Sequence, residues 1–113
     1  MSCVGAPGQP GIARIWHGRT SAANADAYER LLQREIFPAI AARNSPGFRG
    51  IELLRRTLDD GVEFVTIMRF DSLDAVRAFA GSDYEAAVIP PAARALLDRF
   101  DARSAHYTVS ELR

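Results

Sequence analysis

The chain contains no lysine and only one cysteine. All fourteen of its basic residues are arginines, and they balance fourteen acidic residues to a formal net charge of zero. A chain without net charge has no excess of positive charge that would attract nucleic acid or an anionic membrane surface, so we expect neither as a partner. Cys3 stands alone in a stretch rich in Gly and Pro. A disulfide framework is therefore excluded, and a reducing cytoplasm is the simplest setting.

Long hydrophobic runs and catalytic motifs are also missing. No run approaches the roughly 20 apolar residues needed to span a bilayer, and the first residues lack the basic and apolar regions of a secretory signal. The chain has no CxxC pair, HExxH motif, phosphate-binding glycine loop or nucleophile elbow, so we expect no metal or nucleotide site and no serine-hydrolase activity. Residues 1–10 are expected to form a flexible tail, and residues 11–113 a single domain.

What the chain does contain is the composition of a globular domain, with 113 residues of which 48% are hydrophobic and 25% charged. Its clearest local signal lies in residues 48–70, where two runs rich in β-branched and aromatic residues flank Asp59, Asp60 and Gly61. Asp-Gly between such runs predicts a two-stranded hairpin, because glycine tolerates positive φ. An isolated hairpin is marginal in water, so the flanking sequence must supply further strands and helices.

The flanking patterns predict those elements. Before the hairpin they are a strand over 12–19 and a helix from Thr20 or Ser21 to about Arg43 that Pro38 should kink. After it come a helix capped by Asp71 or Ser72 and ended by Gly81, helices over 82–88 and 91–100, and a strand over 104–109. The order β-α-β-β-α-β predicts an α+β ferredoxin-like sandwich, with four antiparallel strands in spatial order 4-1-3-2 and helices on one face.

Alternation along the strands assigns the two faces of this sheet. Three residues of the third strand are assigned to the helix-covered face, namely Val65, Ile67 and Arg69. The other face is assigned Trp16 of the first strand together with Phe64, Thr66, Met68 and Phe70 of the third. Such an apolar face favours cover by a second copy of the sheet, so we expect a homodimer. A one-residue difference in register would exchange the faces.

Five segments together resemble a known family: IARIWHGRT, ADAYERLLQREIFPAI, PGFRGIELLRR, EFVTIMRFDSLDAVRAFAGSDYEAAV and SAHYTV. They are similar to the antibiotic biosynthesis monooxygenase family of dimeric α/β barrels over about residues 11–109. The resemblance implies a homodimer paired through its sheets and a ligand pocket between helices and sheet in each subunit. Relatives include cofactor-independent oxygenases of quinols and anthrone-type polyketides, heme-degrading enzymes, and members without a known substrate.

The site residues of two branches of that family are changed in this chain. The asparagine, tryptophan and histidine of the heme-degrading branch correspond approximately to Ile15, Arg69 and Val88, which argues against heme degradation. Quinol-oxygenase-like members often carry a histidine in the second helix and a His-Phe pair after it. This chain has Ala78 and Asp83-Tyr84 at those places, so only the aromatic residue persists.

A cofactor-free oxygenase needs a base that deprotonates a phenol or quinol, and a cation or donor that stabilises the resulting anion. The candidates are His17 or His106 as the proton acceptor and Arg69 as charge stabiliser. If both histidines point toward the helices, they share a pocket with Arg69, Glu63 and Tyr28. Candidate substrate-binding residues are Trp16, Tyr28, Glu63 and Tyr84. The simpler alternatives are a strand-end histidine for His17, an arginine reaching solvent for Arg69, and dimer-core packing for Trp16.

Three functional hypotheses follow from these residues and the resemblance. The first is a homodimeric monooxygenase that needs no metal or flavin and acts on a small aromatic, quinone-type or polyketide-type metabolite. The second is a non-catalytic dimeric binding or accessory domain, which the missing family histidines favour. The third is a cyclase or isomerase on the same barrel that uses acid-base chemistry alone. An enclosed cavity of at least roughly 300 Å³ with convergent polar groups would indicate a ligand site.

Overall fold

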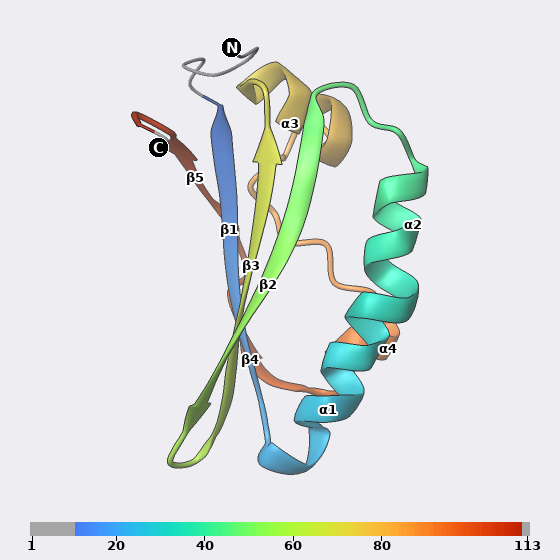
Figure 1. Cartoon of the computed structure of the whole chain (residues 1–113), viewed down its shortest axis with the longest axis vertical. Coiled ribbons are helices and arrows are strands. Elements are labelled where there is room, and N and C mark those ends of the chain that lie inside the picture. The colour runs from blue at the N-terminus through green and yellow to red at the C-terminus, as the bar shows by residue number, and fades with distance from the viewer. Residues whose placement is uncertain (1–10, 112–113) are drawn as a thin grey trace.

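The computed structural model describes residues 11–111. Figure 1 shows a twisted antiparallel sheet with all helices on one of its faces. This is the predicted α+β ferredoxin-like architecture. The expected tail, with Cys3, lies outside the described residues. Within the described range, no helix combines the length and apolar character that a membrane crossing requires.

The sheet has five strands centred on β1. Their bounds are β1 (Ile12–Thr20), β2 (Phe48–Leu58), β3 (Gly61–Phe70), β4 (Leu97–Phe100) and β5 (Ala105–Thr108). The order is β2-β3-β1-β4, and β5 also pairs with β1. Because β5 pairs with the first half of β1 and β4 with its last residues, both take the place of the predicted fourth strand. The order is consistent with the predicted 4-1-3-2.

The β2–β3 hairpin forms where the sequence predicts it. The strands are joined by Asp59 and Asp60, and Gly61 opens β3 with a φ of 156°. A Cβ atom at Gly61 would lie 2.6 Å from the carbonyl oxygen of Thr20, so glycine is required for space as well as for backbone conformation. A second glycine in the hairpin, Gly50, has a φ of 150° beside a register shift in β2.

The long helix is continuous but not uniform. It consists of α1 (Ala22–Leu31), a π-helical turn η1 (Leu32–Ile36) and α2 (Phe37–Ala42). Ser21 caps its start, because its hydroxyl accepts a hydrogen bond from the backbone N–H of Asn24. The π-helical turn lies directly before the position of Pro38, whose ring and missing N–H disfavour an ordinary α-helical turn. This wider turn takes the place of the predicted kink.

In the C-terminal half, one predicted helix is wrong and another is longer in the prediction than in the structure. The helix after the hairpin is confirmed as α3 (Leu73–Ala80), capped by the hydroxyl of Ser72 and ended at Gly81. Residues 82–88, however, form no helix, because their backbone groups bond to residues 102–104 and to a side chain of β1. The predicted helix over 91–100 is limited to α4 (Pro91–Arg94), and the residues after it form β4, which pairs with the end of β1.

The predicted face assignment is also wrong, by the one-residue exchange noted above. Phe64, Met68 and Phe70 are buried under the helices, and Thr66 lies on the same face. Val65, Ile67 and Arg69 therefore lie on the outer face, since neighbours in a strand alternate. The large aromatic residues and Met68 fill the space under the helices, where they bury more apolar area than the smaller β-branched residues would.

Gly61→Ala is expected to destabilise the protein more than Gly50→Ala. Both changes place a side chain at positive φ, which costs about 1–3 kcal/mol. Only the change at Gly61 adds a contact with a carbonyl oxygen, whereas a Cβ at Gly50 meets nothing within 4 Å. Urea unfolding of the two variants measures the difference, and equal losses of unfolding free energy would contradict the role assigned to Thr20.

Candidate functional site

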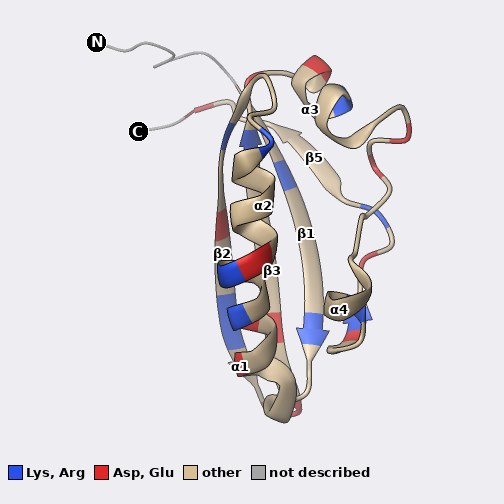
Figure 2. Ribbon diagram, turned by 90° about the vertical axis from the view of Figure 1, so that its right-hand side faces the viewer, with Lys and Arg blue, Asp and Glu red and all other residues tan. Residues whose placement is uncertain are grey.

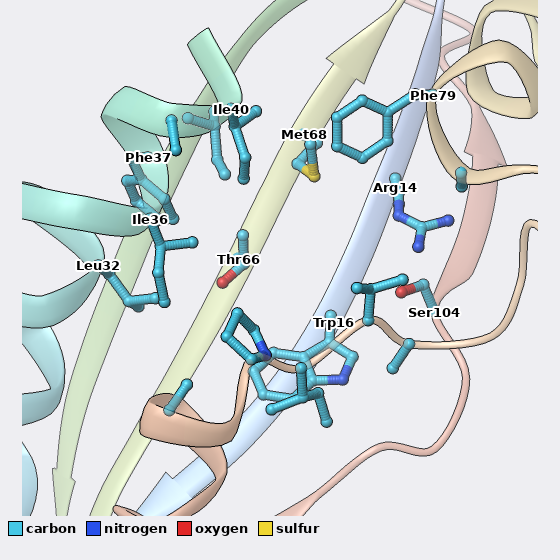
Figure 3. Close-up of a pocket in the computed structure, with 18 of the residues that line it drawn as sticks. Arg14, Trp16, Leu32, Ile36, Phe37, Ile40, Thr66, Met68, Phe79 and Ser104 are labelled. Carbon is cyan, nitrogen blue, oxygen red and sulfur yellow. The ribbon is translucent and has the colours of Figure 1, made fainter. Parts of the chain in front are cut away.

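The main cavity lies between the sheet and the helix layer and has a volume of about 520 Å³. Figure 3 shows its walls: Leu32, Ile36, Phe37 and Ile40 from the long helix, Phe79 from α3, and Arg14, Trp16, Thr66 and Met68 from β1 and β3. The rest of the lining comes from Tyr28, Glu35, Ala39, Arg43, Ile51, Ala80, residues 87–90, Ala93 and Ser104, so Glu35 and Arg43 are the charged lining residues besides Arg14. Most of this surface is apolar, and the volume exceeds the threshold set above for a ligand site.

Arg14 brings a positive charge into this apolar wall. Its side chain comes from the middle of β1, and the residue is only 5% exposed. The Nη1 group donates to the carbonyl oxygen of Tyr84, and Nη2 donates to that of Ala86 at 3.4 Å. Within residues 11–111 no carboxylate forms an ion pair with Arg14. Burial lowers the pKa of its guanidinium, which still remains protonated at neutral pH.

His106 is the third partner of Arg14. The two residues are paired in register between β5 and β1, and Arg14 Nη1 lies 2.9 Å from His106 Nε2. The edge of the imidazole packs against the ring of Tyr84, with 5.1 Å between centroids. Burial lowers the pKa of His106, and the nearby positive charge of Arg14 lowers it further, against a smaller opposing effect of Glu85. The imidazole is therefore neutral at neutral pH.

Three hydroxyl groups add hydrogen-bonding capacity to the cavity lining. They belong to Tyr28, Thr66 and Ser104, and Figure 3 shows the last two directed into the cavity. Burial raises the pKa of Tyr28 to about 12, so its phenol is protonated at neutral pH and can donate. The Tyr28 ring also packs on Phe64 at 4.8 Å between centroids, which fixes its position in the core.

Trp16 forms the aromatic floor of the cavity next to Arg14. Its indole N–H donates to the carbonyl oxygen of Asp101 at 2.7 Å, and its ring stacks on Phe100 at 6.4 Å between centroids. Gly18 leaves the space for that ring, because a Cβ atom there would lie 2.6 Å from the Trp16 Cη2 atom. The indole is thus held in place but presents its ring to the cavity.

The structure separates the residues that sequence reasoning placed in one pocket. Trp16 and Tyr28 line the cavity, while His106 and Tyr84 lie behind Arg14. The other three candidates lie on the outer face of the sheet. His17 Nδ1 lies within hydrogen-bond distance of Asp101 Oδ2, at 3.1 Å, while Arg69 pairs with Glu52 at 3.6 Å and Glu63 with Arg56 at 2.8 Å. The predicted shared pocket of His17, His106 and Arg69 is therefore wrong.

Arg14, Thr66 and Ser104 were not among the predicted site residues. A signal for Arg14 was present, because it is the one charged residue on the face of the first strand that it shares with Ile12 and Trp16. A charged residue at such a position lies either in a wet interface or in a polar cavity. Thr66 and Ser104 carry no comparable signal. As for metal ions, residues 11–111 contain no cluster of three His, Cys, Asp or Glu side chains that could hold one.

The fold and the cavity define a small ferredoxin-like domain with a largely apolar site between its sheet and its helices. A sequence profile described as antibiotic biosynthesis monooxygenase matches residues 19–91. The chain belongs to the antibiotic biosynthesis monooxygenase family, as the resemblance in its sequence indicated. Its role is accordingly monooxygenase-like. No functionally curated protein sequence matches the chain.

Solved structures of the same architecture support this placement. SnoaB, a cofactor-independent oxygenase from Streptomyces nogalater, is 25% identical, with a TM-score of 0.54 over 92% of this chain and 95% of SnoaB. Two further structures share the fold. One is the monooxygenase from the gene ActVA-Orf6 of Streptomyces coelicolor, solved with the ligand nanaomycin D, at 18% identity and a TM-score of 0.55 over 88% of each chain. The other, from Bacillus cereus and provisionally assigned as an antibiotic biosynthesis monooxygenase, is 17% identical with a TM-score of 0.63 over 92% and 95%.

The neutral, buried state of His106 predicts a pH dependence of stability. Since its pKa is lower in the folded than in the unfolded protein, the unfolded state binds more protons between the two values. The free energy of unfolding should therefore fall as pH drops from about 6.5, the unfolded value, through the lower folded value. The ionisable groups around the ring are Arg14, Tyr84 and Glu85.

Urea unfolding between about pH 7.5 and 5 measures this dependence. The wild-type protein is compared with His106→Gln, because carboxylates contribute equally to both. The wild type should lose more stability than the variant over this range. Parallel curves for the two proteins would show that His106 is not held neutral by the fold.

Proposed function

We propose that the protein is a cofactor-independent monooxygenase that acts on a small aromatic, quinol-type or anthrone-type metabolite. The observation that carries this proposal is the buried Arg14 in the wall of an apolar cavity of about 520 Å³. Such a cavity accommodates a ligand of two or three fused rings, and its one buried cation has no carboxylate partner within the described residues. Membership of the family and the likeness to SnoaB support the same reaction class.

The proposed reaction follows from what this cavity can stabilise. The substrate loses a proton to solvent and becomes a phenolate or enolate, and Arg14 stabilises the negative charge on oxygen. The electron-rich anion then reduces molecular oxygen. In the overall reaction of an anthrone-type CH₂ group, one oxygen atom becomes the new carbonyl oxygen. The other leaves as water with both hydrogens, so the ring carbon is oxidised and oxygen is reduced without a further co-substrate.

The remaining groups of the cavity would orient the substrate. Trp16 offers a flat surface on which an aromatic ring can stack, and Phe79 lies on another part of the wall. The hydroxyls of Tyr28, Thr66 and Ser104 can hydrogen-bond to substrate oxygens. His17 and Arg69, on the opposite face of the sheet, have no part in this arrangement.

Arg14→Met is expected to lower kcat/KM for oxygen consumption by a factor of about 100 or more, as loss of an oxyanion-stabilising donor does. The measurement is oxygen uptake with a panel of anthrones and naphthohydroquinones, in the presence of a chelator and without added flavin. Arg30→Met is the matched control, since Arg30 is exposed on α1 and outside the cavity. His17→Ala should also retain activity.

Other outcomes of this assay would overturn the proposal. Substrate turnover without oxygen consumption would identify a cyclase or isomerase instead. Tight binding of the aromatic compounds without any turnover would identify a binding domain. Full activity of Arg14→Met, once circular dichroism has confirmed its fold, would show that the cation has no part in the reaction.

We also propose that the protein is a homodimer paired through the outer face of its sheet. The apolar side chains of that face are Ala13, Ile15, Leu54, Val65, Ile67 and Tyr107, as the strand registers place them. Tyr107 is 56% and Leu54 43% exposed, although both are large and apolar. Ion pairs such as Arg69–Glu52 and Arg56–Glu63 border the patch, as a polar rim borders an interface. A second copy offers the same patch, so a two-fold pairing covers both.

Ile67→Glu is expected to convert the dimer to a monomer, because it places a charge at the centre of the proposed interface. Sedimentation equilibrium should give twice the 12.4 kDa chain mass for the wild type and the single mass for the variant. Arg34→Glu, at an exposed position of the helix layer, should leave the dimer intact. A wild-type protein that sediments as a monomer at micromolar concentration would contradict the proposed pairing.

A further inference from the structure

The contact between Arg14 and His106 defines the protonation state of the imidazole. A guanidinium has only N–H donors, so at 2.9 Å the Nε2 atom of His106 must accept. The ring proton then resides on Nδ1. That Nδ1 atom is buried and has no hydrogen-bond partner among the described residues. The single lone pair of the neutral ring is thus already used by Arg14, and His106 has none left to take a proton from a substrate.

This geometry changes the role that the sequence suggested for His106. A general base needs a free lone pair within reach of the proton that it removes. His106 lies behind Arg14 as seen from the cavity and is not among the residues that line it. What the imidazole does instead is hold one Nη1 hydrogen of Arg14 in a fixed direction, while the carbonyl oxygens of Tyr84 and Ala86 hold two others.

The three partners of Arg14 have one property in common: they are electrically neutral. They satisfy hydrogen-bond donors of the guanidinium but leave its charge uncompensated. A guanidinium has five N–H donors, and within residues 11–111 the Nε–H of Arg14 has no acceptor. A buried charge of this kind is strongly stabilised by an opposite charge placed next to it. The adjacent space for such a charge is the cavity, whose other charged lining residues are Glu35 and Arg43.

We propose that His106 is the positioning residue that keeps Arg14 directed at the oxyanion, a phenolate or enolate, of the ligand in the cavity. This inference rests on the proposed function, since it adds a residue to the site that stabilises the oxyanion there. The proton of the ligand leaves to solvent on binding. An opposite charge within a few ångströms lowers the pKa of an acidic group by about 1 to 3, whereas burial alone raises the pKa of a phenol, as it does for Tyr28.

The test is an absorbance titration of bound 1-naphthol, whose neutral and ionised forms have different spectra, in the absence of oxygen. In the wild type, the pKa of bound 1-naphthol should be lower than that of the free compound by about 1 to 3. Arg14→Met should abolish this lowering. 1-Methoxynaphthalene, which cannot ionise, should bind to both proteins with dissociation constants that agree within a factor of about 3, because it depends on the cavity alone.

Two substitutions at His106 separate positioning from mere packing. Gln has an amide oxygen that can accept a hydrogen bond from Arg14, so His106→Gln should keep most of the lowering of the pKa of bound 1-naphthol. Leu has similar bulk but no acceptor, so His106→Leu should lose at least half of it. His17→Gln, on the opposite face, is the matched control and should behave as the wild type. Arg14→Lys keeps the positive charge but lacks the planar set of N–H donors of a guanidinium. It should therefore retain part of the lowering of the pKa of bound 1-naphthol. It replaces Arg14→Met if that variant does not fold.

The possible failures are distinguishable. If 1-methoxynaphthalene binds but the pKa of bound 1-naphthol equals that of the free compound, Arg14 stabilises no oxyanion, and both the proposed reaction and the role of His106 are wrong. If Arg14→Met abolishes the lowering of this pKa but His106→Leu does not, only the role of His106 is wrong and the proposed function survives. If neither compound binds to the wild-type protein, the cavity is not a site for aromatic ligands and both proposals fail. A lowering in His106→Leu as large as in the wild type would remove His106 from the role of positioning residue.

Discussion

A buried positive charge on the central strand determines how the last third of the chain is arranged. A guanidinium removed from water needs hydrogen-bond acceptors even when it lacks a counter-ion, since an unsatisfied buried charge costs several kcal/mol. The acceptors of Arg14 come from two segments far away in sequence, the 81–90 stretch and β5. Residues 82–88 cannot form the predicted helix while their carbonyl groups point at Arg14. The end of the stretch instead closes one side of the cavity, which residues 87–90 line.

Much of the fold was predictable because its signals are local. The hairpin follows from Asp-Gly between two β-rich runs, and the two confirmed helix starts follow from Ser21 and Ser72. The failures concern information that is not local. A strand such as β3 is apolar on both faces, so alternation gives two equivalent assignments, and only packing against helices decides between them. Likewise, nothing in residues 97–100 indicates that the end of β1 needs a partner strand.

The candidate site was predictable to about the same extent. Trp16, Tyr28 and His106 lie in or beside the cavity, as their residue types suggested, whereas His17 and Arg69 do not. The reason is the inverted face assignment, which placed every candidate residue of β1 and β3 on the wrong face of the sheet. Arg14 could not be recognised from the sequence as the partner of His106, because their contact depends on the register between β1 and β5. Charged residues elsewhere lie mainly on β2, on α1 and in the outer loops (Figure 2), which makes the buried one exceptional.

The central strand serves both faces of the sheet, and this links the cavity to the proposed dimer. Arg14 and Trp16 point to the cavity, while their neighbours Ala13 and Ile15 point to the outer face. A side chain can hold a charge in a fixed direction only if its backbone is fixed. On the helix side the cavity leaves β1 partly unsupported, because about 520 Å³ of space replaces packed atoms there. A second sheet packed on the outer face would supply that support. The proposed pairing of two sheets would thus cover an apolar surface and also keep Arg14 in position, so that dimerisation and ligand binding both depend on β1.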